Sequence, residues 1–248
     1  LLFVPGIKPF DLFHPERKRR VKLYVKRVYI TDEGVELIPS YLRFLRGVVD
    51  SADLPLNISR ETLQKSLVLD KIRESVTNKV LGEFKKRAEK EPAEYVKFWD
   101  NFGAAIKEGL CEANSPREKI LDACRFYSSL TLGGEELTCL TDYKSRMKEG
   151  QEAIYFLTGD TLATLKHSPQ LEGFTKRGLE VLLLTDHVDD FWPNVTQKYG
   201  ELPFRSVTKA GADLEKFKLD DADEKAEETA EKSADTAKLC EVMEALFG

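Results

Sequence analysis

Between residues 68 and 88 an apolar side chain returns every four positions, and this repeat constrains the fold more than any other feature of the sequence. The repeat consists of Val68, Ile72, Val76, Val80, Phe84 and Ala88. Side chains three or four residues apart share one face of an α-helix, so we predict a long helix with one buried face. Ser59 is a suitable N-cap. Pro92 should stop or kink this helix because proline lacks an amide hydrogen.

Further helices are predicted after Pro92. A second apolar face consists of Tyr95, Trp99, Phe102 and Ile106. A third helical stretch is predicted to contain Ile120, Leu121, Cys124 and Tyr127. The pair Gly133-Gly134 should end this stretch, and residues 141–149 favour a further short helix.

Strand patterns stand on both sides of these helices. Residues 1–4, 21–25, 28–30 and 47–51 favour strands before them, with a short helix at 37–45, and residues 153–157, 179–184 and 204–207 favour strands after them. The alternation slips at Lys26-Arg27, which a bulge or a change of partner would explain. The nearly continuous apolar run at 179–184 is typical of a strand buried on both faces of a parallel sheet. Helices at 161–166 and 189–199 complete a second unit, so the pattern predicts an α/β protein.

The charge is concentrated in one segment. The net charge is −5, and residues 213–235 contain ten acidic and four basic residues, so the rest of the chain is close to +1. We expect a charged linker there, followed by the start of an amphipathic helix. No apolar run approaches the ~20 residues that span a bilayer.

The cysteines and histidines do not have the spacing of a metal site. Cys111, Cys124, Cys139 and Cys240 form no Cys-x-x-Cys pair, and the three histidines do not cluster with them. We therefore expect no zinc site and reduced thiols, as in a cytosolic protein. Because residue 1 is a leucine within a predicted strand, we also expect the chain to be a fragment.

The segment before the long helix contains the strongest candidate for chemistry. Arg60 stands beside the predicted N-cap, where a cation opposes the helix dipole. An anion such as phosphate would be bound by the guanidinium and the free amide groups together. Gln64 lies four residues on, so it shares this face of the helix. The alternative is an ordinary solvated arginine.

Several motifs resemble the middle segment of the ninety-kilodalton heat-shock protein family, in its bacterial type. These are DLPLNISRE at residues 53–61, KLYVKRVYITDE at 22–33, PFDLF at 9–13, RMKEGQ at 146–151 and IYF at 154–156. The resemblance implies a unit like the second domain of ribosomal protein S5, then a helical connector and a smaller α/β unit. The predicted segments are residues 1–108, with the catalytic loop; 109–149, the connector; 150–209, the small unit; 210–235, the linker; and 236–248, the start of a C-terminal domain.

The resemblance implies an ATP-dependent chaperone whose ATP and Mg²⁺ are bound mainly by a separate N-terminal domain. Arg60 would reach the γ-phosphate, Gln64 would support it, and Asn57 would lie in the same loop. The arrangement resembles an arginine finger. The isolated chain should have negligible ATPase activity, since it has no P-loop or Gly-rich nucleotide motif.

The resemblance also implies partners. These are the N-terminal ATPase domain and the C-terminal dimerisation domain of the same chain, a second copy in a homodimer, and unfolded client polypeptides, in the cytoplasm. Phe191, Trp192 and Asn194 fall in the region that faces clients. Exposed aromatic side chains there would support client contact, whereas a buried Trp192 would support packing. Tyr29 falls where the family has an aromatic residue near the catalytic loop; it would either pack against that loop or fill the core, and we favour the core.

Two other function classes fit the sequence. A non-catalytic interaction scaffold would not need Arg60. An RNA-binding protein with an S5-like fold would use the basic run Arg17–Arg20, although no aromatic platform accompanies that run.

Overall fold

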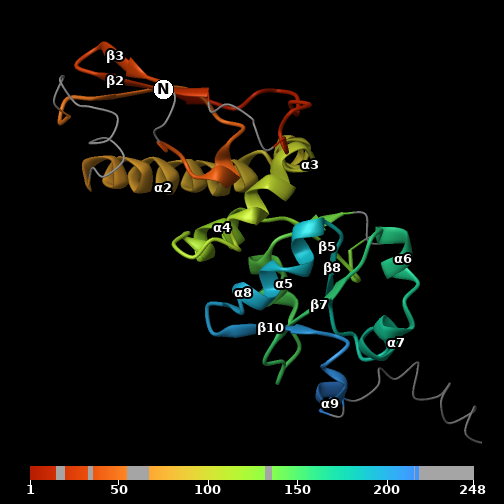
Figure 1. The fold of residues 1–248 in the computed structure, drawn as a ribbon. Helices are drawn as coiled ribbons and strands as arrows, with labels where there is room; N and C mark the ends of the chain where they lie inside the picture. The colour runs from red at the N-terminus through yellow and green to blue at the C-terminus, as the bar shows by residue number, and fades with distance from the viewer. Residues whose placement is uncertain (15–19, 33–35, 55–66, 132–135, 215, 218–248) are drawn as a thin grey trace, which may run out of the picture.

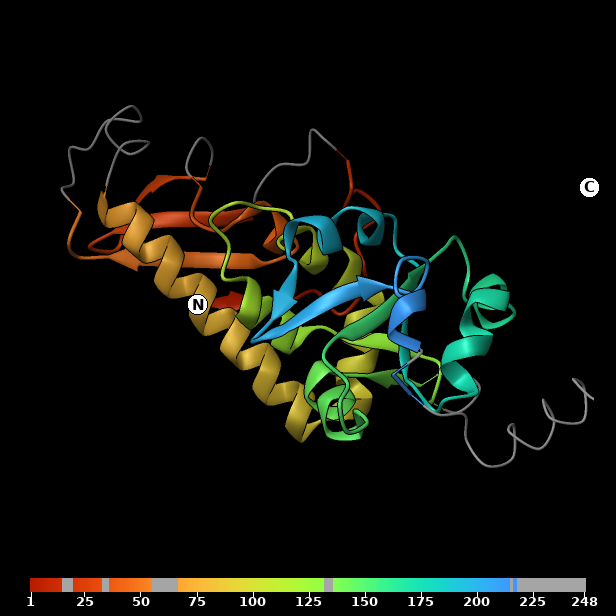
Figure 2. The same ribbon diagram turned by 90° about the horizontal axis from the view of Figure 1, so that it is seen from below.

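Two α/β units lie one after the other along the molecule, with helices between them (Figures 1 and 2). The structure is a computed structural model, and it describes residues 1–14, 20–32, 36–54, 67–131, 136–214 and 216–217. One hydrophobic core extends from Leu12 in the first unit to Trp192 in the second. A smaller core, which includes Tyr155 and Phe174, lies on the other side of the second sheet.

The first unit is built on a four-stranded sheet in the order β1-β4-β2-β3. Its strands are β1 (Leu2–Phe3), β2 (Arg20–Val25), β3 (Val28–Thr31) and β4 (Arg46–Ser51). The central pair, β2 and β4, is parallel, and both edge strands are antiparallel to their neighbours. Val21, Leu23 and Val25 alternate along β2 and are buried, as the period of a strand requires.

The break in the pattern at Lys26-Arg27 is a hairpin turn between β2 and β3. Both residues have positive φ angles, 49° and 68°, as the central residues of a type I′ turn do. The predicted bulge or change of partner is therefore wrong at this position, and the register shift in the pair lies earlier, between Leu23 and Tyr24. The predicted helix at 37–45 is present only as the short 3₁₀-helix η1 (Ser40–Leu42).

Two helices pack beneath this sheet, α2 (Leu67–Lys90) and α3 (Pro92–Glu108). The prediction that Pro92 ends the first helix is confirmed, since Pro92 begins α3. The predicted apolar face of α3 is also confirmed, because Tyr95, Trp99, Phe102 and Ile106 are all buried. The buried face of α2 consists of Leu69, Thr77, Leu81, Phe84 and Ala88. It overlaps the predicted face at Phe84 and Ala88, while the predicted Ile72, Val76 and Val80 are only partly buried against the core. The predicted N-cap, Ser59, lies outside the described residues.

The helices α4 (Arg117–Ala123) and α5 (Leu140–Arg146) lie between the units. The third predicted helix is wrong at its end, because Tyr127 lies in strand β5 (Phe126–Ser128). This strand and β6 (Leu137–Thr138) pair within the second sheet. The boundary predicted between residues 149 and 150 remains a prediction, although the second sheet takes strands from both sides of it.

The second sheet has six strands in the order β6-β5-β8-β7-β10-β9. Its remaining elements are β7 (Ile154–Thr158), α6 (Leu162–Lys166), α7 (Pro169–Thr175), β8 (Val181–Leu184), η3 (His187–Asp190), α8 (Trp192–Val195), β9 (Lys198–Tyr199), β10 (Leu202–Ser206) and α9 (Gly211–Leu214). All four residues of β8 are buried, as predicted. The strand is parallel to β7 and antiparallel to β5, so the sheet is mixed.

The predicted α/β fold class is confirmed by these two mixed sheets and their helices. The beginning of the predicted linker is packed, because Leu214 and Phe217 contact the smaller core. Within the described ranges, every helix is too short or too polar to cross a membrane.

Candidate functional site

The predicted catalytic residues Asn57, Arg60 and Gln64 lie outside the described residues. The structure does define the chain immediately before them. Leu54 is buried and Ser51 is nearly so, and the amide of Asp53 donates to Ser51 Oγ at 3.3 Å. The amide of Lys26 also donates to the carbonyl of Ser51, at 3.2 Å. The hairpin turn thus fixes the point at which the chain leaves β4.

The same hairpin displays an aromatic ring that we expected in the core. Tyr29 is 49% exposed, so that expectation is wrong. Its ring makes an edge-to-face contact with Tyr24, with centroids 5.7 Å apart, and its hydroxyl donates to Asp32 Oδ1 at 2.8 Å. The hydrogen bond to Asp32 raises the pKa of Tyr29, so the phenol is neutral at physiological pH.

Apolar side chains are also exposed where α2 begins. Leu67 is 78% exposed and Val68 is 36% exposed. The first turn of α2 and the hairpin lie at the same end of the molecule in both views (Figures 1 and 2). This end therefore presents uncovered apolar groups next to the segment that contains Arg60, which suits a surface on which another domain docks.

The three residues predicted to face clients have different exposures. Phe191 is 64% exposed and Asn194 is also exposed, whereas Trp192 is completely buried. The indole of Trp192 packs edge-to-face on Phe204 at 5.0 Å and against Phe126 at 6.1 Å. Its Nε1 donates to Asp189 Oδ1 at 2.6 Å. Trp192 is therefore a packing residue, and of the three predicted residues Phe191 and Asn194 are the exposed ones.

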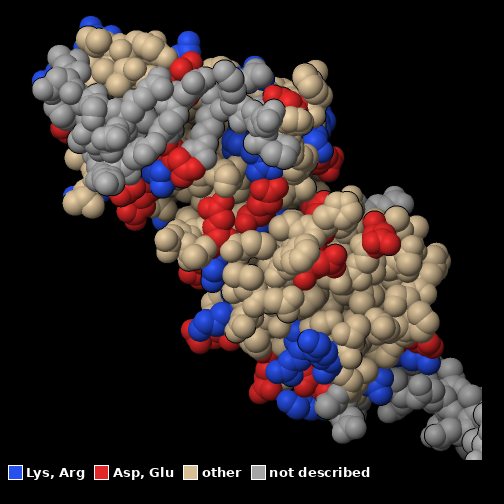
Figure 3. All heavy atoms as spheres, in the orientation of Figure 1, with Lys and Arg blue, Asp and Glu red and all other residues tan. Residues whose placement is uncertain are grey.

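This segment belongs to a face of the second unit that has few charged side chains, although Asp190 next to Phe191 is exposed. Figure 3 shows that the face of the second unit turned to the viewer has few charged side chains, while acidic and basic groups gather along its boundary with the first unit and at its lower end. The helix α8 lies on this face (Figures 1 and 2). Val195 at the end of α8 is 41% exposed and adds to the apolar surface beside Phe191.

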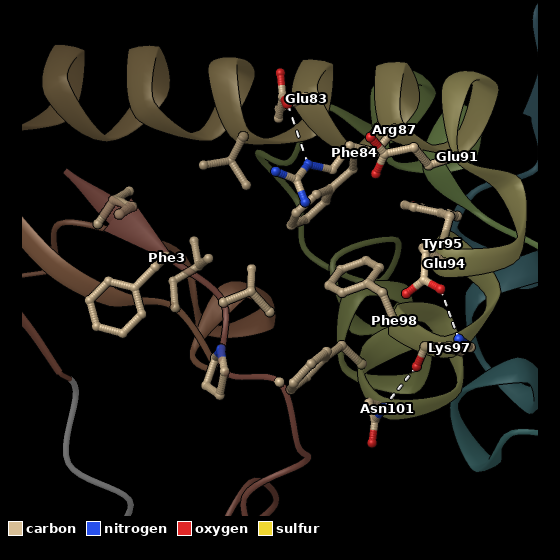
Figure 4. A pocket seen from close by; sticks show the side chains of 17 residues that line it. Phe3, Glu83, Phe84, Arg87, Glu91, Glu94, Tyr95, Lys97, Phe98 and Asn101 are labelled. Atoms are coloured by element: carbon tan, nitrogen blue, oxygen red, sulfur yellow. Dashed lines mark hydrogen bonds and ion pairs between the residues drawn. The ribbon is translucent and has the colours of Figure 1, made fainter.

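A separate groove of about 510 Å³ lies between the β1 segment and the two long helices (Figure 4). Phe84 and Phe98 face it, and charged side chains stand along its rim. Two ion pairs lie on this rim, one between Arg87 and Glu83 and one between Lys97 and Glu94. The groove combines an apolar floor with a charged rim, which suits packing or binding.

Sequence reasoning missed the ionic cluster that holds the η3–α8 segment. Lys107 and Asp189 are buried and form an ion pair at 2.9 Å. A lysine beside an apolar helix face is usually solvated, so nothing in the sequence indicated that Lys107 is buried in an ion pair. The capping box formed by Asp186 and Asp189 could have been found from its Asp-x-x-Asp spacing.

The thiols offer no reactive site in the part of the chain that the structure describes. Cys111, Cys124 and Cys139 are free cysteines there, and burial raises the pKa of Cys124 to about 12. No three His, Cys, Asp or Glu side chains of the described ranges converge as metal ligands would. Arg17 to Arg19 of the basic run, and Cys240, lie outside those ranges.

Comparison with known proteins agrees with the motifs and the fold. The family model described as Hsp90 protein matches residues 1–248. The chain is 55% identical over 238 residues to the chaperone protein HtpG of Ehrlichia canis (strain Jake), covering 95% of this chain and 37% of that protein. It is also 55% identical over 240 residues to the chaperone protein HtpG of Wolbachia pipientis wMel, with the same two coverages.

A solved structure shows the same architecture. The middle domain of a Plasmodium falciparum heat shock protein superposes with a TM-score of 0.70 and 32% identity, covering 84% of this chain and 81% of that one. The chain spans about 37% of the length of the relatives it matches. Because the family model covers the whole chain and the structural neighbour is a middle domain, this chain belongs to the Hsp90 family and corresponds to its middle domain, of the bacterial HtpG type.

Proposed function

We propose that this chain is the middle segment of an ATP-dependent heat-shock chaperone and that it supplies Arg60 to the γ-phosphate of ATP bound by an N-terminal domain. The observation that carries the proposal is the motif DLPLNISRE at residues 53–61, in a chain that the family model matches throughout. Gln64 would support the arginine and Asn57 would shape the loop. A planar guanidinium matches phosphate oxygens with two parallel hydrogen bonds, and charge delivered late in phosphoryl transfer accelerates the reaction.

The surroundings of the loop support this role. The hairpin holds the end of β4 through the contacts of Ser51 with Lys26 and Asp53. Exposed Leu67 and Val68 would be covered by the N-terminal domain as it docks. ATP and Mg²⁺ would be held mainly by that domain, as the family resemblance implies.

The catalytic role is tested in the full-length protein with Arg60→Ala. We expect ATP turnover to fall by roughly 10³-fold or more, the magnitude found for arginine fingers, with nucleotide affinity nearly unchanged. A matched control is Arg73→Ala, because Arg73 lies in α2 and donates to the carbonyl of Glu36. Normal turnover in Arg60→Ala with a folded protein would refute the role of Arg60 and favour the scaffold alternative.

We propose further that Phe191 and Asn194 contact unfolded client polypeptides. Their exposure, on a face of the second unit with few charged side chains, supports this proposal. Trp192 contributes by holding the segment from within. The full-length protein would act as a cytoplasmic homodimer joined through a C-terminal domain, and it would engage clients on this face.

Neighbouring residues provide a sharp test of the client surface. Phe191→Ala should weaken binding of an unfolded polypeptide and leave the free energy of unfolding within about 0.5 kcal/mol of the parent, as for most surface changes. Trp192→Ala should instead destabilise the fold by about 3–5 kcal/mol, since it removes a buried aromatic side chain. Unchanged affinity in Phe191→Ala and in Asn194→Ala would exclude this surface.

A further inference from the structure

Two consecutive residues at the end of α3 bind side chains in different units. Lys107 Nζ lies 2.9 Å from Asp186 Oδ2 and 2.9 Å from Asp189 Oδ2, both in the second unit. Glu108 accepts two hydrogen bonds from Arg43 of the first unit, at 2.6 and 2.7 Å. We call Lys107 and Glu108 together the α3 joint.

The half of the joint that faces the second unit is buried. Lys107 is 4% exposed and Asp189 is 1% exposed. Burial alone would lower the pKa of Lys107, but the carboxylates of Asp189 and Asp186 outweigh burial and raise it. The ammonium group therefore stays charged and must keep its partners, because an unpaired buried charge is costly.

The segment bound by Lys107 is the one that presents Phe191. Asp189 also accepts hydrogen bonds from Trp192 Nε1 and from the amide of Asp186. At the other end of the segment, Thr196 Oγ1 donates to the carbonyl of Leu110, just beyond α3, at 2.7 Å. Residues 186–196 are thus held at both ends by α3 and the residues that follow it.

We propose that the α3 joint positions the client-facing segment relative to the unit that contains the Arg60 loop, so that client binding and nucleotide binding alter each other's free energy. This inference rests on the proposed function. Lys107 and Glu108 are positioning residues, since neither contacts nucleotide or client.

The chemistry of the joint explains why it would transmit an orientation. A buried ion pair with fixed hydrogen bonds favours one arrangement of the groups that it joins. The bidentate contact between Arg43 and Glu108 is likewise directional. Coupling between two sites commonly changes affinity about 5- to 150-fold, and it must be reciprocal.

The test compares full-length variants with matched changes in α3. Lys107→Met/Asp189→Asn removes one positive and one negative charge, so the buried carboxylate is neutralised together with the lysine, and the carboxylate that loses its partner, Asp186, is 38% exposed to solvent. Glu108→Gln weakens the other half of the joint at a partly exposed position. The control is Lys97→Met, in the same helix, where the lysine is 71% exposed and paired with Glu94. Reduced, carboxymethylated α-lactalbumin serves as the unfolded probe, with and without a non-hydrolysable ATP analogue.

The quantity compared is the ratio of the probe's affinity with the analogue to its affinity without it. We expect this ratio to differ from one in the parent and in Lys97→Met, and to approach one in Lys107→Met/Asp189→Asn and in Glu108→Gln. Basal ATP turnover should stay within about twofold of the parent in both, and Lys107→Arg should restore part of the ratio. The inference would be overturned if folded joint variants kept the ratio of the parent. It would also be overturned if the analogue left the parent's affinity for the probe unchanged. Either result leaves the Arg60→Ala test standing, so the two proposals can fail separately.

Discussion

At the scale of single residues, Glu180 is another buried charge in the second unit besides Asp189. Its side chain is 2% exposed and accepts hydrogen bonds from Arg146 at 2.8 and 2.9 Å, and from Ser128 Oγ. The cluster joins β5 and α5 to the residue that precedes β8. Such a pair contributes little net stability while intact, but removal of one partner leaves a charge stranded in the interior.

We therefore expect Arg146→Ala to lower the free energy of unfolding by about 2–4 kcal/mol, somewhat less than for a fully buried pair because the guanidinium is partly exposed. Urea denaturation measures this change. Lys97→Ala breaks an exposed pair with Glu94 and should cost less than about 1 kcal/mol. Equal effects of the two variants would show that the Glu180 cluster is not a buried charge network.

A second residue-scale prediction concerns alkaline pH. Tyr199 donates to Asp122 Oδ1 at 2.6 Å, and burial together with this hydrogen bond raises the pKa of Tyr199 to about 12. An unfolded tyrosine titrates near pH ~10. The hydroxyl therefore contributes stability that is fully present below pH ~10 and is lost as the pH rises toward the folded value.

Tyr199→Phe should flatten the dependence of the unfolding free energy on pH between about 10 and 12. Urea unfolding at several pH values measures the slope. Tyr24→Phe is the control, because Tyr24 lies on the opposite face of β2 from buried Leu23. An unchanged slope in Tyr199→Phe would contradict the assignment.

At the scale of elements, the sequence predicts those that are long and packed on one side. The face of α3 was predicted correctly because it packs against a single core. The face of α2 was predicted in part, since Phe84 and Ala88 are buried and Ile72, Val76 and Val80 are partly buried against the core. Leu69, Thr77 and Leu81 widen the buried stripe, because α2 contacts both α3 and α4. Strands β5, β6 and β9 have only two or three residues, too few for an alternation to be recognised.

The hairpin between β2 and β3 gives a prediction at this scale. Lys26 and Arg27 adopt the left-handed conformation, which favours Asn and Gly over long side chains. Lys26→Asn/Arg27→Gly should therefore stabilise the chain by roughly 0.5–1 kcal/mol, measured by urea denaturation. Lys26→Ala/Arg27→Ala keeps the strain and serves as the control. A loss of stability in the Asn-Gly variant would mean that the two long side chains make contacts that offset the strain.

At the scale of the whole molecule, the two units share one core, and the α3 joint links them by charge as well. The order of the elements and the α/β class follow from local patterns. The joint could not be predicted, because Lys107 and Asp189 are 82 residues apart in the sequence and only the folded arrangement brings them together. Arg60 was found through a motif, since one arginine at a helix cap has no distinctive physical signature.

The most direct measurement is the single-turnover rate of ATP hydrolysis by the full-length protein with Arg60→Lys. Lysine retains the positive charge but lacks the planar fork that binds two phosphate oxygens. If the guanidinium meets the γ-phosphate in the transition state, the rate constant should fall nearly as far as in Arg60→Ala, with ATP affinity preserved. A rate constant equal to that of the parent would contradict the account.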